Sequence, residues 1–263
     1  MREMVVAGQF YPDSKERLEK EIKKYLKREP DATIKAAVVP HAGYLFSGRC
    51  AGKVFSKIPR AGTYVIIGVN HRGIGEDVAV SLEPFHTPLG IVGNDVELGE
   101  EILRALQIYE SEDAHQMEHS IEVQLPFLQS IYENPTIAPI LLKNYDLEKC
   151  KKVSGAIVNS ANKLRRRIVV IASSDFTHTG HAYDFSGSLD IDKEAIDKIL
   201  ALDSEGFLET AAKTTICGAG AIATAIEAGK LMNISKGELL EYYDSSSILN
   251  NENKVGYAGI VFR

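Results

Sequence analysis

The sequence predicts an α/β fold in which helices cover both faces of a mixed, largely parallel central sheet. Short apolar, β-branched segments alternate with longer segments whose apolar residues recur every three or four positions. Strands that alternate with helices are typical of parallel sheets buried on both faces. The 263 residues contain no internal repeat and no Pro- or Ser-rich linker, so we expect a single domain over residues 1–263.

Each strand is predicted from a run of β-branched and other apolar residues. The expected strands are 36–40, 63–69, 136–142, 167–173 and 256–262, with weaker candidates at 76–81 and 239–246. The polar segment 245–253 separates the last two strands, which predicts a hairpin and hence some antiparallel pairing.

Helical periodicity marks the segments between the strands. The expected helices are 14–28, 47–58, 95–107, 119–133, 146–164, 191–202, 204–213 and 219–232. Ser47 and Asp203 are expected to begin two of them, because their side chains can accept a hydrogen bond from a free N–H of the first turn.

Composition excludes several classes of function. The net charge is −6, from 30 basic and 36 acidic residues, and no basic cluster suggests binding to nucleic acid or to an anionic membrane. No apolar run is long enough to span a bilayer, and the N-terminus lacks the pattern of a signal peptide. Three cysteines do not make a disulfide framework, so we expect a cytoplasmic protein.

Histidines follow three of the predicted strands. His41 comes after 36–40, His71 after 63–69, and Asp175, His178 and His181 after 167–173. One histidine at a strand end is usually structural, but the carboxyl ends of parallel strands share one edge of a sheet, where ligand sites gather. Three such ends favour a shared metal or catalytic site. Asp175 is expected to accept an imidazole N–H there, with a turn role as the alternative.

Cys217 precedes a glycine-rich helix start, "CGAGAI". The positive end of a helix lowers the pKa of a thiol and favours the thiolate, which binds metals and attacks electrophiles. Packing as a small apolar residue is the alternative, and it is the interpretation we prefer for Cys50 and Cys150.

A further acidic and histidine-containing segment spans 113–129. Glu118 and Glu122 are four residues apart, which places them on one face of the predicted helix with His119 beside them. His119 is expected either to line a pocket or to cap the helix. Glu118 and Arg72 are further candidates for the lining of that pocket. The roles of His86, His115 and His181 are left open.

Several of these stretches together resemble the Memo family, which is similar in fold to the class III extradiol dioxygenases. The resemblance is carried, in order, by "GQFYP", "PHAGYLFSG", "NHRG", "EHSIEVQLPFL", "SSDFTH", "CGAGAI" and "GYAGIVF". It implies a metal site formed by His41, His71 and Cys217, with His178 as an acid/base histidine and Asp175 as the acid beside it.

The resemblance implies iron or copper as the cofactor, with zinc as an alternative. The dioxygenases use two histidines and a carboxylate around Fe(II), and here Cys217 takes the place of the carboxylate. A thiolate is a softer ligand that activated oxygen readily oxidises, so ring cleavage is not expected.

Three functions follow as hypotheses. The first is a redox metalloprotein acting on an unidentified small molecule. The second is a non-catalytic module that recognises peptides or phosphorylated ligands through the same cleft, which would require Arg49 or Arg72 nearby. The third is a zinc hydrolase with His178 or Glu118 as general base. The sequence does not predict the oligomeric state.

Overall fold

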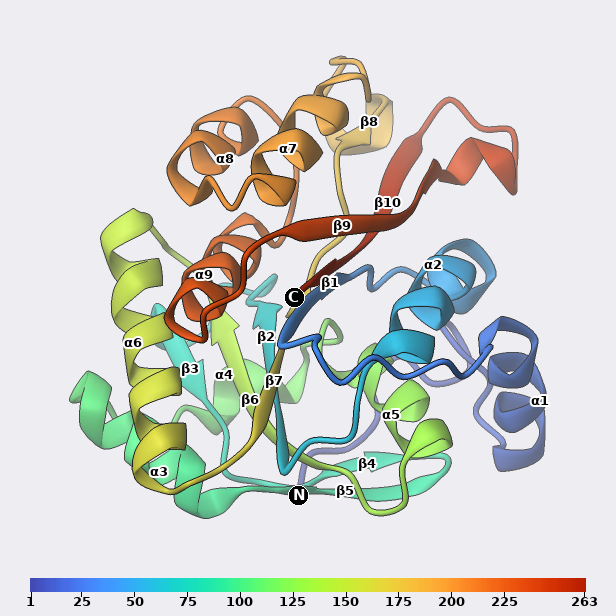
Figure 1. Ribbon diagram of the computed structural model, residues 1–263. Helices are drawn as coiled ribbons and strands as arrows, with labels where there is room; N and C mark the ends of the chain where they lie inside the picture. The colour runs from blue at the N-terminus through green and yellow to red at the C-terminus, as the bar shows by residue number, and fades with distance from the viewer.

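Apolar strands form a ten-stranded mixed sheet in the computed structural model, which describes residues 1–263 (Figure 1). The strands are β1 (Ala36–Val39), β2 (Thr63–Val69), β3 (Val78–Val80), β4 (Phe85–Thr87), β5 (Gly90–Asn94), β6 (Thr136–Leu142), β7 (Ile168–Ser173), β8 (His178–Thr179), β9 (Gly237–Asp244) and β10 (Lys254–Phe262). The central strands β5, β6, β2, β7 and β1 are parallel and adjacent in that order. Antiparallel strands extend this core: β4 pairs with β5, β3 with β6, β10 with β1, and both β8 and β9 with β10.

Two layers of helices enclose the sheet. The α-helices are α1 (Lys15–Tyr25), α2 (Tyr44–Lys57), α3 (Val96–Leu106), α4 (Glu112–Gln116), α5 (Leu125–Ile131), α6 (Leu147–Lys163), α7 (Ile191–Leu200), α8 (Ser204–Ala211) and α9 (Ala219–Leu231). Short 3-10 helices occupy Glu122–Gln124, His181–Tyr183 and Ser245–Ser247. None of the helices combines the length and the apolar composition that crossing a bilayer requires.

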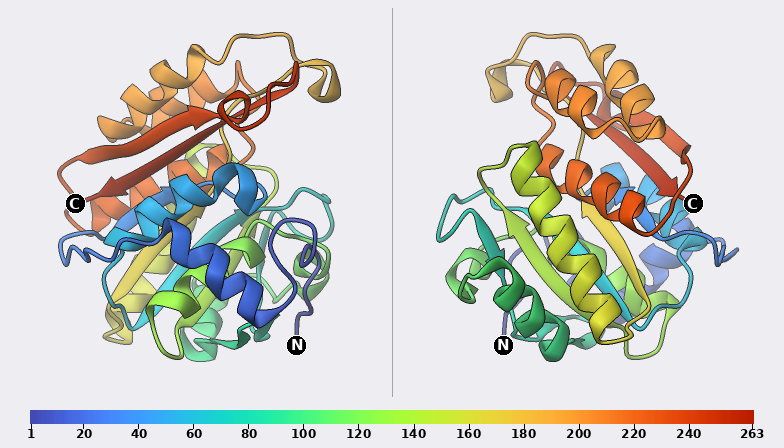
Figure 2. Two further views of the ribbon diagram at one scale, coloured as in Figure 1. Left: turned by 90° about the vertical axis from the view of Figure 1, so that its right-hand side faces the viewer. Right: turned by 60° about the vertical axis from the view of Figure 1, so that its left-hand side comes forward.

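Successive residues of each central strand contribute to two different cores. In β1, Ala36 and Val38 pack into the core on the side of α3, α6 and α9, whereas Ala37 and Val39 pack into the core on the side of α1, α2 and α5 (Figure 2). Successive side chains of a strand point to opposite faces, so a strand that is apolar at every position needs a cover on both faces. This confirms the predicted architecture.

The structure confirms the strong predicted strands and the hairpin of the last two, and corrects several details. Strands β4, β5 and β8 were not predicted, because they are two to five residues long and lack an apolar run. The predicted helix 119–133 is wrong over its first part, which forms a turn and a 3-10 helix before α5 begins.

The two predicted helix starts have different outcomes. Asp203 does cap α8, since its side chain accepts the N–H of Gly206 at 2.9 Å. Ser47 does not begin α2, which follows Gly43; the Ser47 hydroxyl donates instead to the carbonyl of Ala42.

A buried carboxylate anchors the N-terminal segment to the 3-10 helix Glu122–Gln124. Glu122 is fully buried and forms an ion pair with the buried Arg2. It also accepts the N–H groups of Val5 and Val6 and the hydroxyl of Tyr11. The predicted pairing of this residue with Glu118 on one helical face is therefore wrong.

Replacing Glu122 with Gln should lower the free energy of unfolding by about 3–5 kcal/mol, because Arg2 would remain buried without a counter-charge. Denaturant unfolding measures the loss. The matched control is Glu19→Gln, which removes one partner of an exposed pair with Lys15 and should change stability by less than about 0.5 kcal/mol. Equal effects of the two substitutions would contradict the assigned anchor.

His115 makes stability depend on pH. The side chain is buried against the carbonyl of Ala79, and burial lowers its pKa from 6.5 to about 4. The unfolded chain therefore binds the proton first as the pH falls from 6.5 to 4, so stability is lost through that window by about 3 kcal/mol.

His115→Gln should remove this contribution, so that its unfolding free energy falls less between pH 7 and pH 4 than that of the parent. His86→Gln is the control, since His86 pairs with Glu3 on the surface. An unchanged pH profile in His115→Gln would refute the effect.

Candidate metal centre

Three loops bring the predicted ligands together at the carboxyl edge of the parallel strands. His41 lies two residues beyond the end of β1, His71 two residues beyond the end of β2, and Cys217 two residues before α9. The candidate ligand atoms of these three residues all lie within 4.8 Å of one another. The sequence prediction that these remote residues converge is confirmed.

The distances suit a single ion. The Cys217 sulfur lies 3.3 Å from Nε2 of His41, and the rings of His41 and His71 are nearly perpendicular, with centroids 5.3 Å apart. Metal–nitrogen bonds of about 2.0 Å and metal–sulfur bonds of about 2.3 Å require separations of this order between neighbouring ligand atoms.

In both candidate ligand histidines, a neighbouring side chain holds the ring through Nδ1. Nδ1 of His41 lies 3.0 Å from the hydroxyl of Ser173, and Nδ1 of His71 lies 3.0 Å from the Glu118 carboxylate. Such partners fix the ring orientation and leave Nε2 free to bind a metal. The donor set therefore fits a metal ion, and sequence reasoning missed Ser173 altogether.

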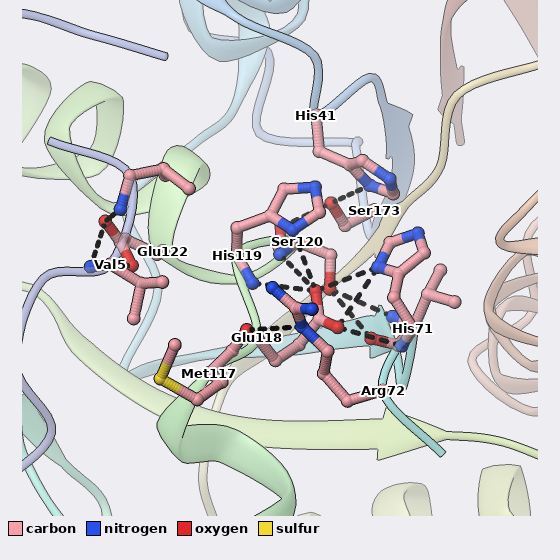
Figure 3. A network of polar contacts seen from close by, with 12 residues as sticks. Val5, His41, His71, Arg72, Met117, Glu118, His119, Ser120, Glu122 and Ser173 are labelled. Carbon is pink, nitrogen blue, oxygen red and sulfur yellow. Dashed lines mark hydrogen bonds and ion pairs between the residues drawn. The ribbon is translucent and has the colours of Figure 1, made fainter. Parts of the chain in front are cut away.

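Glu118 connects two segments of the site (Figure 3). Its carboxylate accepts the backbone N–H groups of His71, His119 and Ser120 as well as the ring of His71. Contrary to the prediction, Glu118 is not part of the cavity lining and lies behind His71 instead. Burial alone would raise the pKa of Glu118, but the hydrogen bond from His71 and the nearby imidazoles outweigh it and hold the pKa well below its usual range.

His119 lines the cavity, as one of its two predicted roles requires. Its ring stacks on His71 with centroids 4.9 Å apart and meets the edge of Phe10 on its other side at 5.0 Å. Figure 3 shows the rings of His41, His71 and His119 gathered around one space. His71, Glu118 and His119 also form a second group with metal-ligand spacing.

The thiol of Cys217 differs from its prediction. Burial raises its pKa, and the nearby Asp175 carboxylate adds to this effect, so the predicted lowering by the helix end is wrong in the metal-free protein. The backbone N–H of Gly218, directly before α9, donates to the Ser174 hydroxyl rather than to the Cys217 sulfur. Cys50 and Cys150 are buried in the core, as expected.

Asp175 holds a loop rather than an imidazole. Its buried carboxylate accepts the backbone N–H groups of His41 at 2.8 Å and Ala42 at 3.2 Å, so the prediction that it accepts an imidazole N–H is wrong. Burial raises the pKa of Asp175, against the opposing effects of His178 and these two hydrogen bonds.

His178 reaches the same cavity, whose volume is about 540 Å³. Its Nδ1 lies 3.2 Å from the carbonyl of Thr215, so this nitrogen carries the proton and Nε2 is the acceptor in the neutral ring. The Thr215 hydroxyl exchanges hydrogen bonds with the backbone of His178. Thr215 lies two residues from Cys217, but nothing in its local sequence marks this role.

The remaining candidates lie outside the cavity. Arg72 is exposed, with its guanidinium near the carbonyl of Met117, so its predicted place in the pocket lining is wrong. Arg49 forms an ion pair with Glu241 and covers the ring of Tyr243. His86 and His181 do not line the cavity.

Glu118→Gln should weaken metal binding about 10–100-fold, because His71 loses the carboxylate that orients its ring. Competition with a chelator of known affinity measures the change for Zn(II) or Co(II). Glu110→Gln, at an exposed position away from the site, is the control. Unchanged affinity in Glu118→Gln would exclude this role.

Comparison with known proteins identifies the family of this chain. The family model described as Memo-like protein matches residues 2–261. A protein of Archaeoglobus fulgidus named MEMO1 family protein is 41% identical over 265 residues, covering 100% of both chains. Relatives with similar names in Methanosarcina barkeri and Thermococcus onnurineus are 40% and 39% identical, and each comparison covers at least 99% of both chains. The chain belongs to the Memo family.

Proposed function

We propose that this protein is a redox metalloprotein in which His41, His71 and Cys217 hold an iron or copper ion beside a cavity for a small molecule. The observation that carries the proposal is the convergence of the candidate ligand atoms of His41, His71 and Cys217 within 4.8 Å, with Nδ1 of each histidine already engaged by a neighbouring side chain. A bound iron or copper ion would supply one-electron chemistry and coordination positions open to exogenous ligands.

The buried charges favour a divalent ion. Glu118 is a buried carboxylate, and Cys217 becomes a thiolate when it binds a metal. These negative charges, with the Asp175 carboxylate close by, favour a divalent cation over a monovalent one, which supports iron(II) over copper(I), and zinc(II) meets the same requirement. The thiolate in place of a carboxylate departs from the dioxygenase triad, so ring cleavage is not proposed.

His178 is the group that we assign to proton transfer. Its Nδ1 is tied to Thr215, and its ring lines the cavity together with His41 and His71. A neutral imidazole with a free Nε2 accepts a proton from a bound molecule and returns it. Asp175 acts here through the loop that carries His41, as a positioning residue.

His41→Ala and Cys217→Ser should each weaken Fe(II) and Cu(I) binding by more than the about 10–100-fold typical of a lost outer partner. Anaerobic titration gives the affinity and the stoichiometry, and Cys217→Ser should also abolish any thiolate-to-metal charge-transfer band. His86→Ala is the control. Parent-like binding in both site variants would refute the proposal, and hydrolysis of esters or amides with zinc alone would favour the hydrolase instead.

A further inference from the structure

A second cavity lies at the opposite edge of the parallel strands from the candidate metal centre. Its volume is about 400 Å³, and none of its 15 lining residues lines the cavity beside His41. Lys35, in its lining, directly precedes β1, whereas His41 follows this strand, so about 20 Å of extended chain separates the two sites. A ligand of the second cavity would therefore not touch the metal centre.

Three neighbouring strands each bring a cation to this second cavity. Lys35 directly precedes β1, Arg167 directly precedes β7, and Arg60 lies three residues before β2. These strands are parallel and adjacent in the order β2, β7, β1, so their amino ends share one edge of the sheet. The three residues are far apart in the sequence, which is why no basic cluster is visible there.

Backbone contacts fix these three positions relative to one another. The carbonyl of Arg167 accepts the N–H of Gly62 at 2.7 Å, and the guanidinium of Arg167 donates to the carbonyl of Arg60 at 2.6 Å. The carbonyl of Lys35 accepts the N–H of Val170 at 3.0 Å. The three backbone segments are therefore in place before a ligand binds.

The positive charge of the lining is not neutralised by the protein itself. The lining contains no aspartate or glutamate. A fourth cation in it, Arg166, forms ion pairs with Asp95 and Glu97, whereas the other three have no carboxylate within 4.0 Å.

Two helix ends oppose this charge only in part. Helices α6 and α9 both end at the cavity, and the C-terminus of a helix carries roughly half a negative charge, so the two ends offset about one of the three cations. Carbonyls at these ends already have partners: that of Met232 accepts the ammonium of Lys35, and that of Ala161 accepts the backbone N–H of Arg166. The remaining positive charge is available to a ligand.

The rest of the lining favours an organic ligand over a free ion. Ile34, Pro59, Val158 and Leu231 contribute apolar surface, and Leu231 is 53% exposed. Burying such surface against the body of a ligand stabilises the complex. A guanidinium binds a phosphate through two parallel N–H···O bonds, which suits a phosphate ester better than a compact monovalent anion.

From these features we infer that the cavity at the amino edge of the parallel strands binds a small organic phosphate. The phosphate group lies among Lys35, Arg60 and Arg167, and the organic body packs on the apolar part of the lining. The site goes beyond the proposed function and is independent of the ion that the metal centre holds.

Three probes separate the contributions of charge and of apolar body: 1-naphthyl phosphate, 1-naphthol and inorganic phosphate. Calorimetric titration of the full chain gives the Kd of each, with a chelator present so that no metal ion binds the phosphate. 1-Naphthyl phosphate should bind at least about tenfold more tightly than either of the other two, since each lacks one of the two sets of contacts. If either fragment binds as tightly as the whole ester, the inference is wrong.

Two arginine variants test the position of the phosphate. Arg60 is exposed, so Arg60→Gln should leave the fold unchanged and weaken 1-naphthyl phosphate about tenfold or more, through the loss of a charged hydrogen bond. Arg165→Gln is the matched control, because Arg165 is exposed, lies two residues from Arg167 and is outside the lining. Equal losses in the two variants would show attraction to general surface charge and would overturn the inference.

A third variant tests binding at the other edge of the sheet. Arg72 is an exposed cation near the candidate metal centre, and Arg72→Gln should leave the affinity for 1-naphthyl phosphate unchanged. A larger loss in Arg72→Gln than in Arg60→Gln would place the ligand beside the metal centre and refute the second site. Neither result bears on metal binding by His41, His71 and Cys217, which the anaerobic titration measures separately.

Discussion

The arrangement of the site depends on one buried carboxylate, that of Glu118. It joins the loop after β2 to the segment before α5, by accepting three backbone N–H groups and the ring of His71. Charge-assisted hydrogen bonds of this kind are stronger than neutral ones and are shielded here from water. The ring of His71 therefore has one orientation before any ligand arrives.

Asp175 performs the corresponding task on the other side of the site. It links the loop after β7 to the loop after β1, by accepting the N–H groups of His41 and Ala42. Both carboxylates act at the ends of strands that are fixed by the parallel sheet, and sites on such rigid elements are held more precisely than sites on free loops. Asp175 thus fixes the backbone at His41, and Glu118 fixes both the backbone and the ring of His71.

The same carboxylates shape the chemistry of the cavity. Burial raises the pKa of the Cys217 thiol and the negative charge of the two carboxylates adds to this effect, so a metal bound by that sulfur would displace a proton.

Much of the fold was predictable because its signals are local. Apolar runs such as that of β2 need cover on both faces, and this requirement already specifies an α/β sheet. The short strands β4 and β8 were not predictable, since their pairing and not their composition makes them strands. Segment 119–133 misled the analysis for a related reason: its apolar spacing is helical, but Glu118 and Glu122 bind the backbone of other segments and hold its start in a turn.

The sequence by itself determined that His41 and His71 each follow the carboxyl end of a strand, because strand position follows from periodicity and the carboxyl ends of parallel strands share an edge. Only the tertiary structure decided which group holds each ring, since Ser173 and Glu118 are separated from their partners by 132 and 47 positions. It also decided the state of the Cys217 thiol, because burial and the approach of Asp175 depend on how distant loops pack. Hydrogen-bond partners and local dielectric are properties of three-dimensional proximity, and the order of residues along the chain does not encode them locally.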